Sequence, residues 1–299
     1  MTLPAGKSGF VRIQEASADA SRRVWRNKAG SAKVALVPWD MAGVRAKLDR
    51  LDANIEGYNE ELRRYIASDP HEIVPKFDAD TGWHDIFVRA EPPPRVFGLI
   101  LGEAVHNLRS ALDHLAWQLA NVDGAPPRPN LVQFPIYLKP PKDFLALECL
   151  NGMREPHRAM LEMLQPYKAD DRPQVLEMLS WVSNADKHRL LHTTASTGEQ
   201  FVPHFIQARA GYSLQHSEFG YRGILEGETK IGRVLVTPAN EDFQVDMQGA
   251  PMFGVAFSEA GSPVEGYPVD GFILTMKDLV QKIIGIFDRP GQNGSPPWP

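Results

Sequence analysis

The chain has a single cysteine, Cys149, among its 299 residues. One cysteine cannot form an internal disulfide, and it cannot supply a cysteine-rich metal site. We therefore expect a cytoplasmic protein, because reduced thiols suit that compartment, and a chain of this length can bury a substantial hydrophobic core.

Long uninterrupted apolar runs are also missing. The N-terminus lacks the apolar centre of a signal peptide, and the most apolar stretch, FILTMKDLVQKIIGIF, contains Lys277, Asp278 and Lys282. Charges at this spacing predict an amphipathic helix and exclude a membrane span. We therefore expect no membrane partner.

Several sequence signatures of catalysis are absent as well. The chain has no P-loop, no dinucleotide-binding fingerprint and no G-x-S-x-G elbow, which argues against the enzyme classes that depend on them. Its net charge of −5 gives no general attraction to nucleic acid, but residues 1–39 carry +5 and the remainder −10. Such a basic segment can contact phosphates, or it can be a solvated leader.

Two long stretches have the hydrophobic spacing of helices. Apolar residues follow one another at steps of three and four in both stretches, as in a heptad seam. The first seam is Met41, Val44, Leu48, Leu51, Ile55, Tyr58, Leu62 and Tyr65; the second is Phe97, Leu101, Val105, Leu108, Leu112, Leu115 and Leu119. Between them, KFDADTGWHDIFVRA indicates a hairpin or irregular strand pair.

The sequence changes character after Thr194. Short β-type runs broken by glycine and proline follow, and then the amphipathic helix at about 270–288, which we expect to cover the resulting sheet. The prediction is an α+β fold with a bundle containing two long antiparallel helices. We divide it into a basic arm (1–38), a helical bundle (39–194), a β-rich region with its terminal helix (195–288) and a disordered tail (289–299).

The second long helix carries an unusual polar stripe. Glu103, Asn107, Ser110 and His114 lie within about 60° of one another on a helical projection, with His106 and Trp117 beside them. Short hydrogen-bonding side chains of this kind either form a buried network or line a cleft, and the sequence leaves both interpretations open. A second polar group, in NADKHRLLH, adds Asn184, Asp186, Lys187, His188 and His192. Its position at the end of a helix, where cations complement the helix dipole, gives it a structural interpretation as well.

The segment LRSALDHL contains Arg109 and His114 with four residues between them. This spacing resembles the R-x4–6-H signature of HEPN domains, helical bundles found in bacterial toxin and phage-defence ribonucleases. The resemblance covers residues 40–192 and implies a homodimer that cleaves RNA without a metal or other cofactor, with an antitoxin of unknown identity as a further expected partner. GEAVHNLRSALDHL with LQPY and NADKHRLL also resembles a set of uncharacterised bacterial proteins, which implies no activity.

Carried over to this chain, the HEPN resemblance assigns roles to individual residues. His114 would move the proton of the 2′-hydroxyl or leaving oxygen, and Arg109 would stabilise the charge of the phosphorane. Asp113 completes the candidate catalytic set, although as the i+4 partner of Arg109 it equally suits a plain salt bridge. Because the arginine and the histidine are about 140° apart on one helix, they need a partner surface to act together.

Two other hypotheses compete with the ribonuclease. Glu103, His106, His188 and His192 have spacings that suit a zinc, iron or manganese site within a bundle. Alternatively, the chain is a non-enzymatic protein that binds a ligand or partner.

Overall fold

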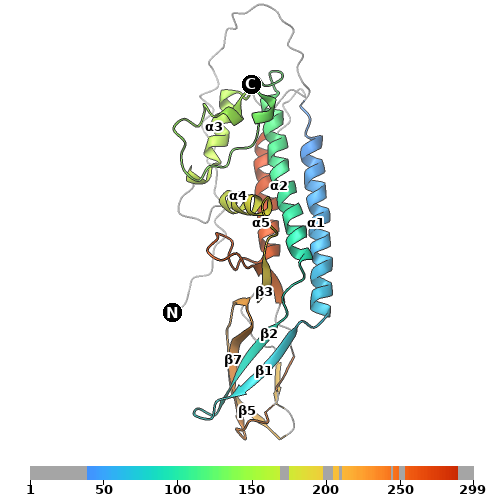
Figure 1. Ribbon diagram of the computed structural model, residues 1–299, viewed down its shortest axis with the longest axis vertical. Helices are drawn as coiled ribbons and strands as arrows, with labels where there is room; N and C mark the ends of the chain where they lie inside the picture. Colours follow the sequence, from blue (N-terminus) through green and yellow to red (C-terminus); the bar gives the residue numbers. More distant parts are fainter. Residues whose placement is uncertain are drawn as a thin grey trace, which may run out of the picture. The chain divides into compact units, whose positions relative to one another are not determined.

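The structure is a computed structural model that describes residues 39–168, 175–197, 205–208, 211–243, 245–248 and 253–288. The predicted basic arm, the predicted C-terminal tail and the helix start expected at residues 171–174 lie outside these ranges. The described residues belong to one compact unit, and they form an α+β fold as the sequence predicts (Figure 1).

Five α-helices occur in the described ranges. They are α1 (Ala42–Ala67), α2 (Val96–Ala120), α3 (Glu155–Met163), α4 (Val175–Asp186) and α5 (Val269–Phe287). Short 3-10 turns cover Pro129–Leu131, Glu148–Leu150 and Pro166–Lys168. None of the described helices combines the length and the apolarity that crossing a membrane requires.

The strands form three antiparallel sheets. The first contains β1 (His71–Phe77), β2 (Trp83–Ala90), β7 (Glu228–Thr237) and β5 (Ser213–Phe219), in that order. The second has the order β6 (Gly223–Leu225), β3 (Thr193–Thr197), β9 (Phe253–Phe257). The third pairs β4 (Phe205–Ala208) with β8 (Val245–Gln248).

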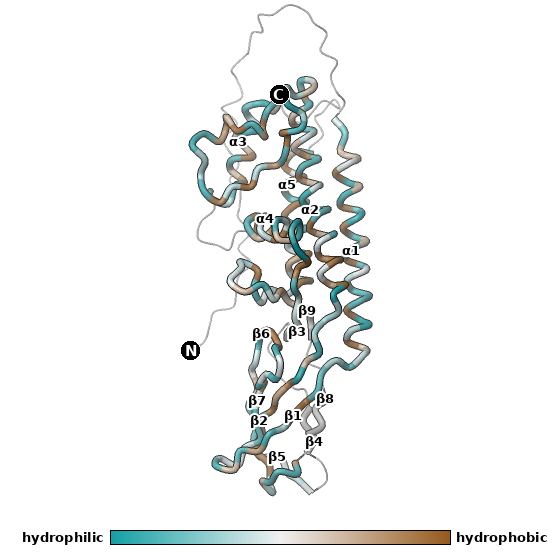
Figure 2. Tube along the Cα trace, viewed as in Figure 1, coloured by the Kyte–Doolittle hydropathy of each residue, from teal (hydrophilic) through white to brown (hydrophobic). Residues whose placement is uncertain are grey.

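The two long helices pack antiparallel and are joined at one end by the β1–β2 hairpin (Figure 1). Both predicted seams face the core: the second is fully buried, whereas Leu48, Ile55 and Leu62 of the first are partly exposed. Figure 2 shows hydrophobic and hydrophilic residues alternating along α1, as expected for a helix with one buried face. The hairpin turn is closed by Asp78, whose carboxylate accepts a hydrogen bond from the amide of Asp80 at 3.0 Å, and by Gly82 at φ +74°.

Two expectations from the sequence need correction. The strands of residues 71–90 pair with β7, so a boundary at residue 194 does not separate the helical part from the β-rich part. The C-terminal helix packs mainly along α2 and α4 and meets the β-layer at β9, so it does not cover the four-stranded sheet. Its fully buried residues, such as Phe272 and Val280, complete the core of the helical bundle.

Helix α2 is therefore the centre of the molecule, because α1, α4 and α5 all pack against it. This arrangement also changes the meaning of the polar stripe. A helix with three helical neighbours has little surface left, so its polar side chains either meet those neighbours or lie in the gaps between them.

Candidate functional site

Two glycines of α2 let the segment that follows α4 approach unusually closely. A Cβ atom on Gly102 would lie 2.1 Å from Oδ1 of Asp186, and one on Gly98 would lie 2.4 Å from the carbonyl oxygen of Leu191. Any side chain at either position would collide with these atoms. The two polar groups of the sequence, 103–118 and 184–192, therefore meet at this point.

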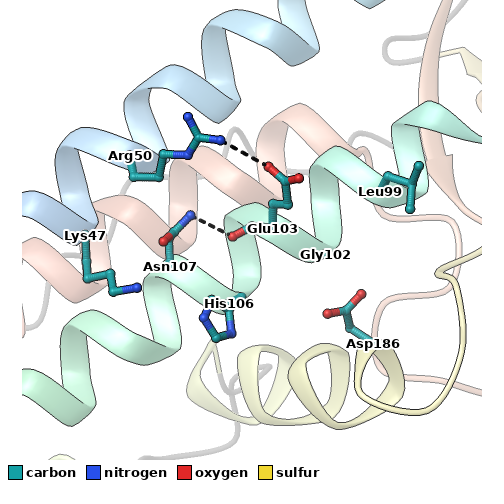
Figure 3. A pocket seen from close by; sticks show the side chains of 8 residues that line it. All are labelled: Lys47, Arg50, Leu99, Gly102, Glu103, His106, Asn107 and Asp186. Atoms are coloured by element: carbon teal, nitrogen blue, oxygen red, sulfur yellow. Dashed lines mark hydrogen bonds and ion pairs between the residues drawn. The ribbon is translucent and has the colours of Figure 1, made fainter.

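An open groove of about 550 Å³ lies where α1, α2 and the end of α4 converge (Figure 3). Its lining residues are Lys47, Arg50, Leu99, Gly102, Glu103, His106, Asn107 and Asp186. A volume of this size is typical of pockets for small molecules. The groove thus contains four of the residues that the sequence singled out, together with two cations of α1 that it did not.

A hydrogen-bonded network forms the floor of the groove between α1 and α2. The Nδ2 atom of Asn107 donates to Oδ1 of Asn54 at 3.0 Å and to the carbonyl oxygen of Glu103 at 2.9 Å, while Nδ2 of Asn54 donates to Oε2 of Glu103 at 2.9 Å. Both asparagines are buried. Asn107 and the backbone of Glu103 therefore form the buried network that was one interpretation of the polar stripe. Asn54 is a partner not anticipated from the sequence, although an asparagine on the buried side of a heptad seam is a recognisable sign of a buried polar contact.

Above this floor, charged side chains are left with few partners. Lys47 and Asp186 make no hydrogen bond or ion pair with any described residue, and the nearest carboxylate to Arg50 is Glu103 at 3.8 Å. His106 is exposed, and its Nε2 lies 3.4 Å from the hydroxyl of Ser110. Burial raises the pKa of the Asp186 carboxyl, and the nearby imidazole of His106 partly offsets that rise.

Arg109 and Asp113 hold the backbone of another segment. The guanidinium donates to the carbonyl oxygen of Phe134 at 2.5 Å and pairs with Asp113 at 3.1 Å. Asp113 in turn accepts a hydrogen bond from the amide of Phe134 at 2.9 Å. The expected i,i+4 salt bridge is confirmed, and it fixes the extended segment around Phe134 against α2.

His114 lies against a different neighbour. It is exposed, and its Nδ1 would be 2.4 Å from a Cβ on Gly43 of α1. Arg109 faces the Phe134 segment instead, so one chain does not bring the arginine and the histidine of the R-x4-H spacing together.

The end of α4 has a structural role as well. Arg189 donates to both carboxylate oxygens of Glu259, at 2.9 and 2.6 Å, and Glu259 also accepts the amide of His192 at 2.8 Å. Burial opposes ionisation of Glu259, but these hydrogen bonds outweigh it and its pKa lies below the usual value. Asn184, Lys187 and His188 are exposed, with Lys187 3.4 Å from Asn184.

The alternative metal site is not formed. Within the described ranges, no three histidine, cysteine or acidic side chains converge as ligands for one ion. Glu103 accepts a hydrogen bond from Asn54, and the backbone amide of His192 donates to Glu259. These two residues of the metal hypothesis therefore contact different neighbours.

The chain was compared with family models, with curated proteins and with solved structures, and none of them matches it.

Proposed function

We propose that this protein binds a small polar ligand in the groove between α1, α2 and α4 without performing chemistry on it. The observation that carries the proposal is that Lys47 and Asp186 border this groove without a partner among the described residues. Unpaired charges in a partly enclosed site cost free energy that a complementary ligand can recover.

The contrast with the rest of the surface supports this proposal. On the solvent-facing side of the four-stranded sheet, cations of neighbouring strands pair with carboxylates: Lys76 and Arg89 with Glu228, Lys230 with Asp85, and Arg233 with Glu218. The charges on this sheet face are therefore neutralised by neighbours, whereas Lys47 and Asp186 in the groove are not.

Catalysis has less support in the groove. A nucleophile needs an adjacent base, and that base needs a third group to orient it. His106 and Ser110 are 3.4 Å apart, which is long for such a pair, and Asp186 forms no hydrogen bond to the imidazole. The residues lie close together, but they do not form an activated set.

The HEPN-like ribonuclease and RNA-binding hypothesis also has less support than ligand binding. It needs Arg109 free to reach a phosphate, whereas the Nη2 atom of this side chain contacts both Asp113 and Phe134 and the side chain is only 18% exposed. Residues 40–299 carry a net charge of −10, which opposes RNA binding by this part of the chain. The homodimer and the antitoxin remain predictions of the HEPN resemblance, and a cytoplasmic setting rests on the single cysteine.

A thermal-shift screen with small charged metabolites tests the proposal. A ligand at 100 times its Kd stabilises the folded state by about 2.7 kcal/mol, enough to raise the Tm by several degrees. His106→Trp fills the groove at an exposed position and should abolish the shift, whereas His216→Trp, the same change at an exposed site on β5, should preserve it. A panel in which no compound depends on the groove contradicts the proposal.

A second assay separates binding from RNA cleavage. We expect total RNA incubated with the purified protein in EDTA to remain intact, both with the wild type and with His114→Ala. Cleavage by the wild type that disappears in His114→Ala, with both proteins folded, would overturn our proposal in favour of the ribonuclease.

A further inference from the structure

The charges that line the groove are divided by sign, apart from Glu103, which lies 3.8 Å from Arg50. Lys47 and Arg50 project from α1 at one side of α2, whereas Asp186 approaches from the end of α4 at the other side (Figure 3). His106 lies between these two groups. We call Lys47 with Arg50 the cationic pole, and Asp186 the anionic pole.

The cationic pole has unused donors. Lys47 has no partner among the described residues, and Arg50, whose side chain is 65% exposed, approaches Glu103 only to 3.8 Å. The Oε2 atom of Glu103, which is the atom nearest to Arg50, already accepts a hydrogen bond from Asn54. A guanidinium with five donors and an ammonium with three can therefore receive a carboxylate or phosphate here.

The anionic pole is unfavourable as it stands. Asp186 is the last residue of α4, where the helix dipole already places partial negative charge, so a carboxylate at this position is repelled unless a cation compensates it. Its neighbour Lys187 extends toward Asn184 instead, at 3.4 Å. The contact with Gly102 also holds the carboxylate close to the groove.

The groove also offers an apolar contact. Leu99, on the same helix as Gly102, lines the groove and is 58% exposed. Leu99 lies at the Asp186 end of the groove (Figure 3), where an apolar part of a ligand can contact it.

We propose that the ligand is a small zwitterion whose ammonium group pairs with Asp186 and whose carboxylate or phosphate pairs with Lys47 and Arg50. This inference rests on the proposed function, because it specifies the ligand class of the same groove. It also explains why Lys47 and Asp186 border one groove without an ion-pair partner among the described residues.

The test uses a series of ω-amino acids of increasing chain length, from 4-aminobutyrate to 8-aminooctanoate, on the full chain. Hexylamine and hexanoate each supply one of the two charges. Binding is followed by chemical-shift changes of backbone amides. We expect one member of the series to bind about tenfold more tightly than either single-charge compound, because each charge-assisted contact contributes at least that factor.

Variants identify the two poles separately. Asp186→Asn should reduce the affinity of the best ω-amino acid to that of hexanoate, and Lys47→Met combined with Arg50→Met should reduce it to that of hexylamine. Asp49→Asn, an exposed position on α1 outside the groove, is the matched control and should change nothing. Circular dichroism shows that each variant is folded.

The outcomes distinguish the two proposals. The zwitterion is refuted, while groove binding stands, if the compounds that shift the Tm through the groove carry one sign of charge only and bind Asp186→Asn with the same affinity as the wild type. Equal affinity for hexylamine, hexanoate and every ω-amino acid also refutes the zwitterion. If no compound is sensitive to His106→Trp, both proposals fail.

Discussion

Gly98 offers the sharpest test of the packing that creates the groove. Replacing a helical glycine by alanine ordinarily stabilises a helix by up to about 1 kcal/mol, and Gly98 lies in the first turn of α2. In Gly98→Ala, however, the new Cβ would lie 2.4 Å from the carbonyl oxygen of Leu191 and 3.1 Å from the side chain of Leu190. The substitution therefore has two opposed effects, and the structure determines which is larger.

The backbone of Leu191 has little freedom to move away. Leu191 is 2% exposed, and the next residue, His192, is fixed on both sides: its amide donates to Glu259 and its carbonyl accepts from Ser258 at 3.0 Å. Forcing a methyl group into a packed site typically costs about 1–3 kcal/mol. After the gain in helix propensity, we expect Gly98→Ala to lower the free energy of unfolding by up to about 2 kcal/mol.

The matched control is Gly57→Ala in α1, because nothing lies within 4 Å of the added Cβ. It should gain up to about 1 kcal/mol, since only the propensity effect applies. Urea unfolding followed by circular dichroism measures both variants against the wild type. If Gly98→Ala proved as stable as Gly57→Ala, the close approach of the segment after α4 to α2 would be refuted, and with it the position of Asp186 beside the groove.

Three further predictions concern other contacts. Burial lowers the pKa of His157 from 6.5 to about 4, so as the pH falls the imidazole is protonated in the unfolded chain before it is protonated in the folded protein. About 3 kcal/mol of stability is therefore lost between pH 6.5 and pH 4. His157→Phe should remove this part of the acid sensitivity in unfolding curves measured across that range. Arg109→Ala should cost about 2 kcal/mol of unfolding free energy by releasing Phe134, and unchanged stability would contradict the structural role of the arginine. Arg189→Met leaves the buried Glu259 without its cation and should cost about 2 kcal/mol at pH 7, and less at a pH where the carboxylate is protonated.

The long helices were predictable because their information is local. Apolar residues spaced three and four apart in residues 41–65 and 97–119 predict which side of each helix is buried, and the structure confirms both seams. The hairpin between them was predictable for the same reason, since the turn signals around Gly82 lie within a few residues of the strands that they join.

The sheet and the groove depend on contacts between distant segments, which spacing does not encode. Strand β2 pairs with β7 about 140 residues later in the chain, and no feature of its sequence, WHDIFVRA, predicts that pairing. Likewise, nothing in the local sequence distinguishes Gly102 from any other helical glycine, and only the structure shows that Asp186 lies against it. The signal was present in GLILG, two small residues four apart, but it indicates only that something approaches closely.

The R-x4-H spacing shows why a motif and its neighbours must be considered together. Arg109 and His114 have the right separation, but the function of each depends on what packs beside it. The segment around Phe134 needs both a donor and an acceptor for its backbone, and Arg109 with Asp113 supply them. The Nη2 atom of Arg109 contacts both Asp113 and Phe134 and the side chain is only 18% exposed, so little of this guanidinium is left for a phosphate. Lys47 and Arg50, which border the groove, belong to a helix that carries no motif, and they lie across α2 from Asp186. We therefore base the proposed ligand site of this chain on unpaired charge and not on residue spacing.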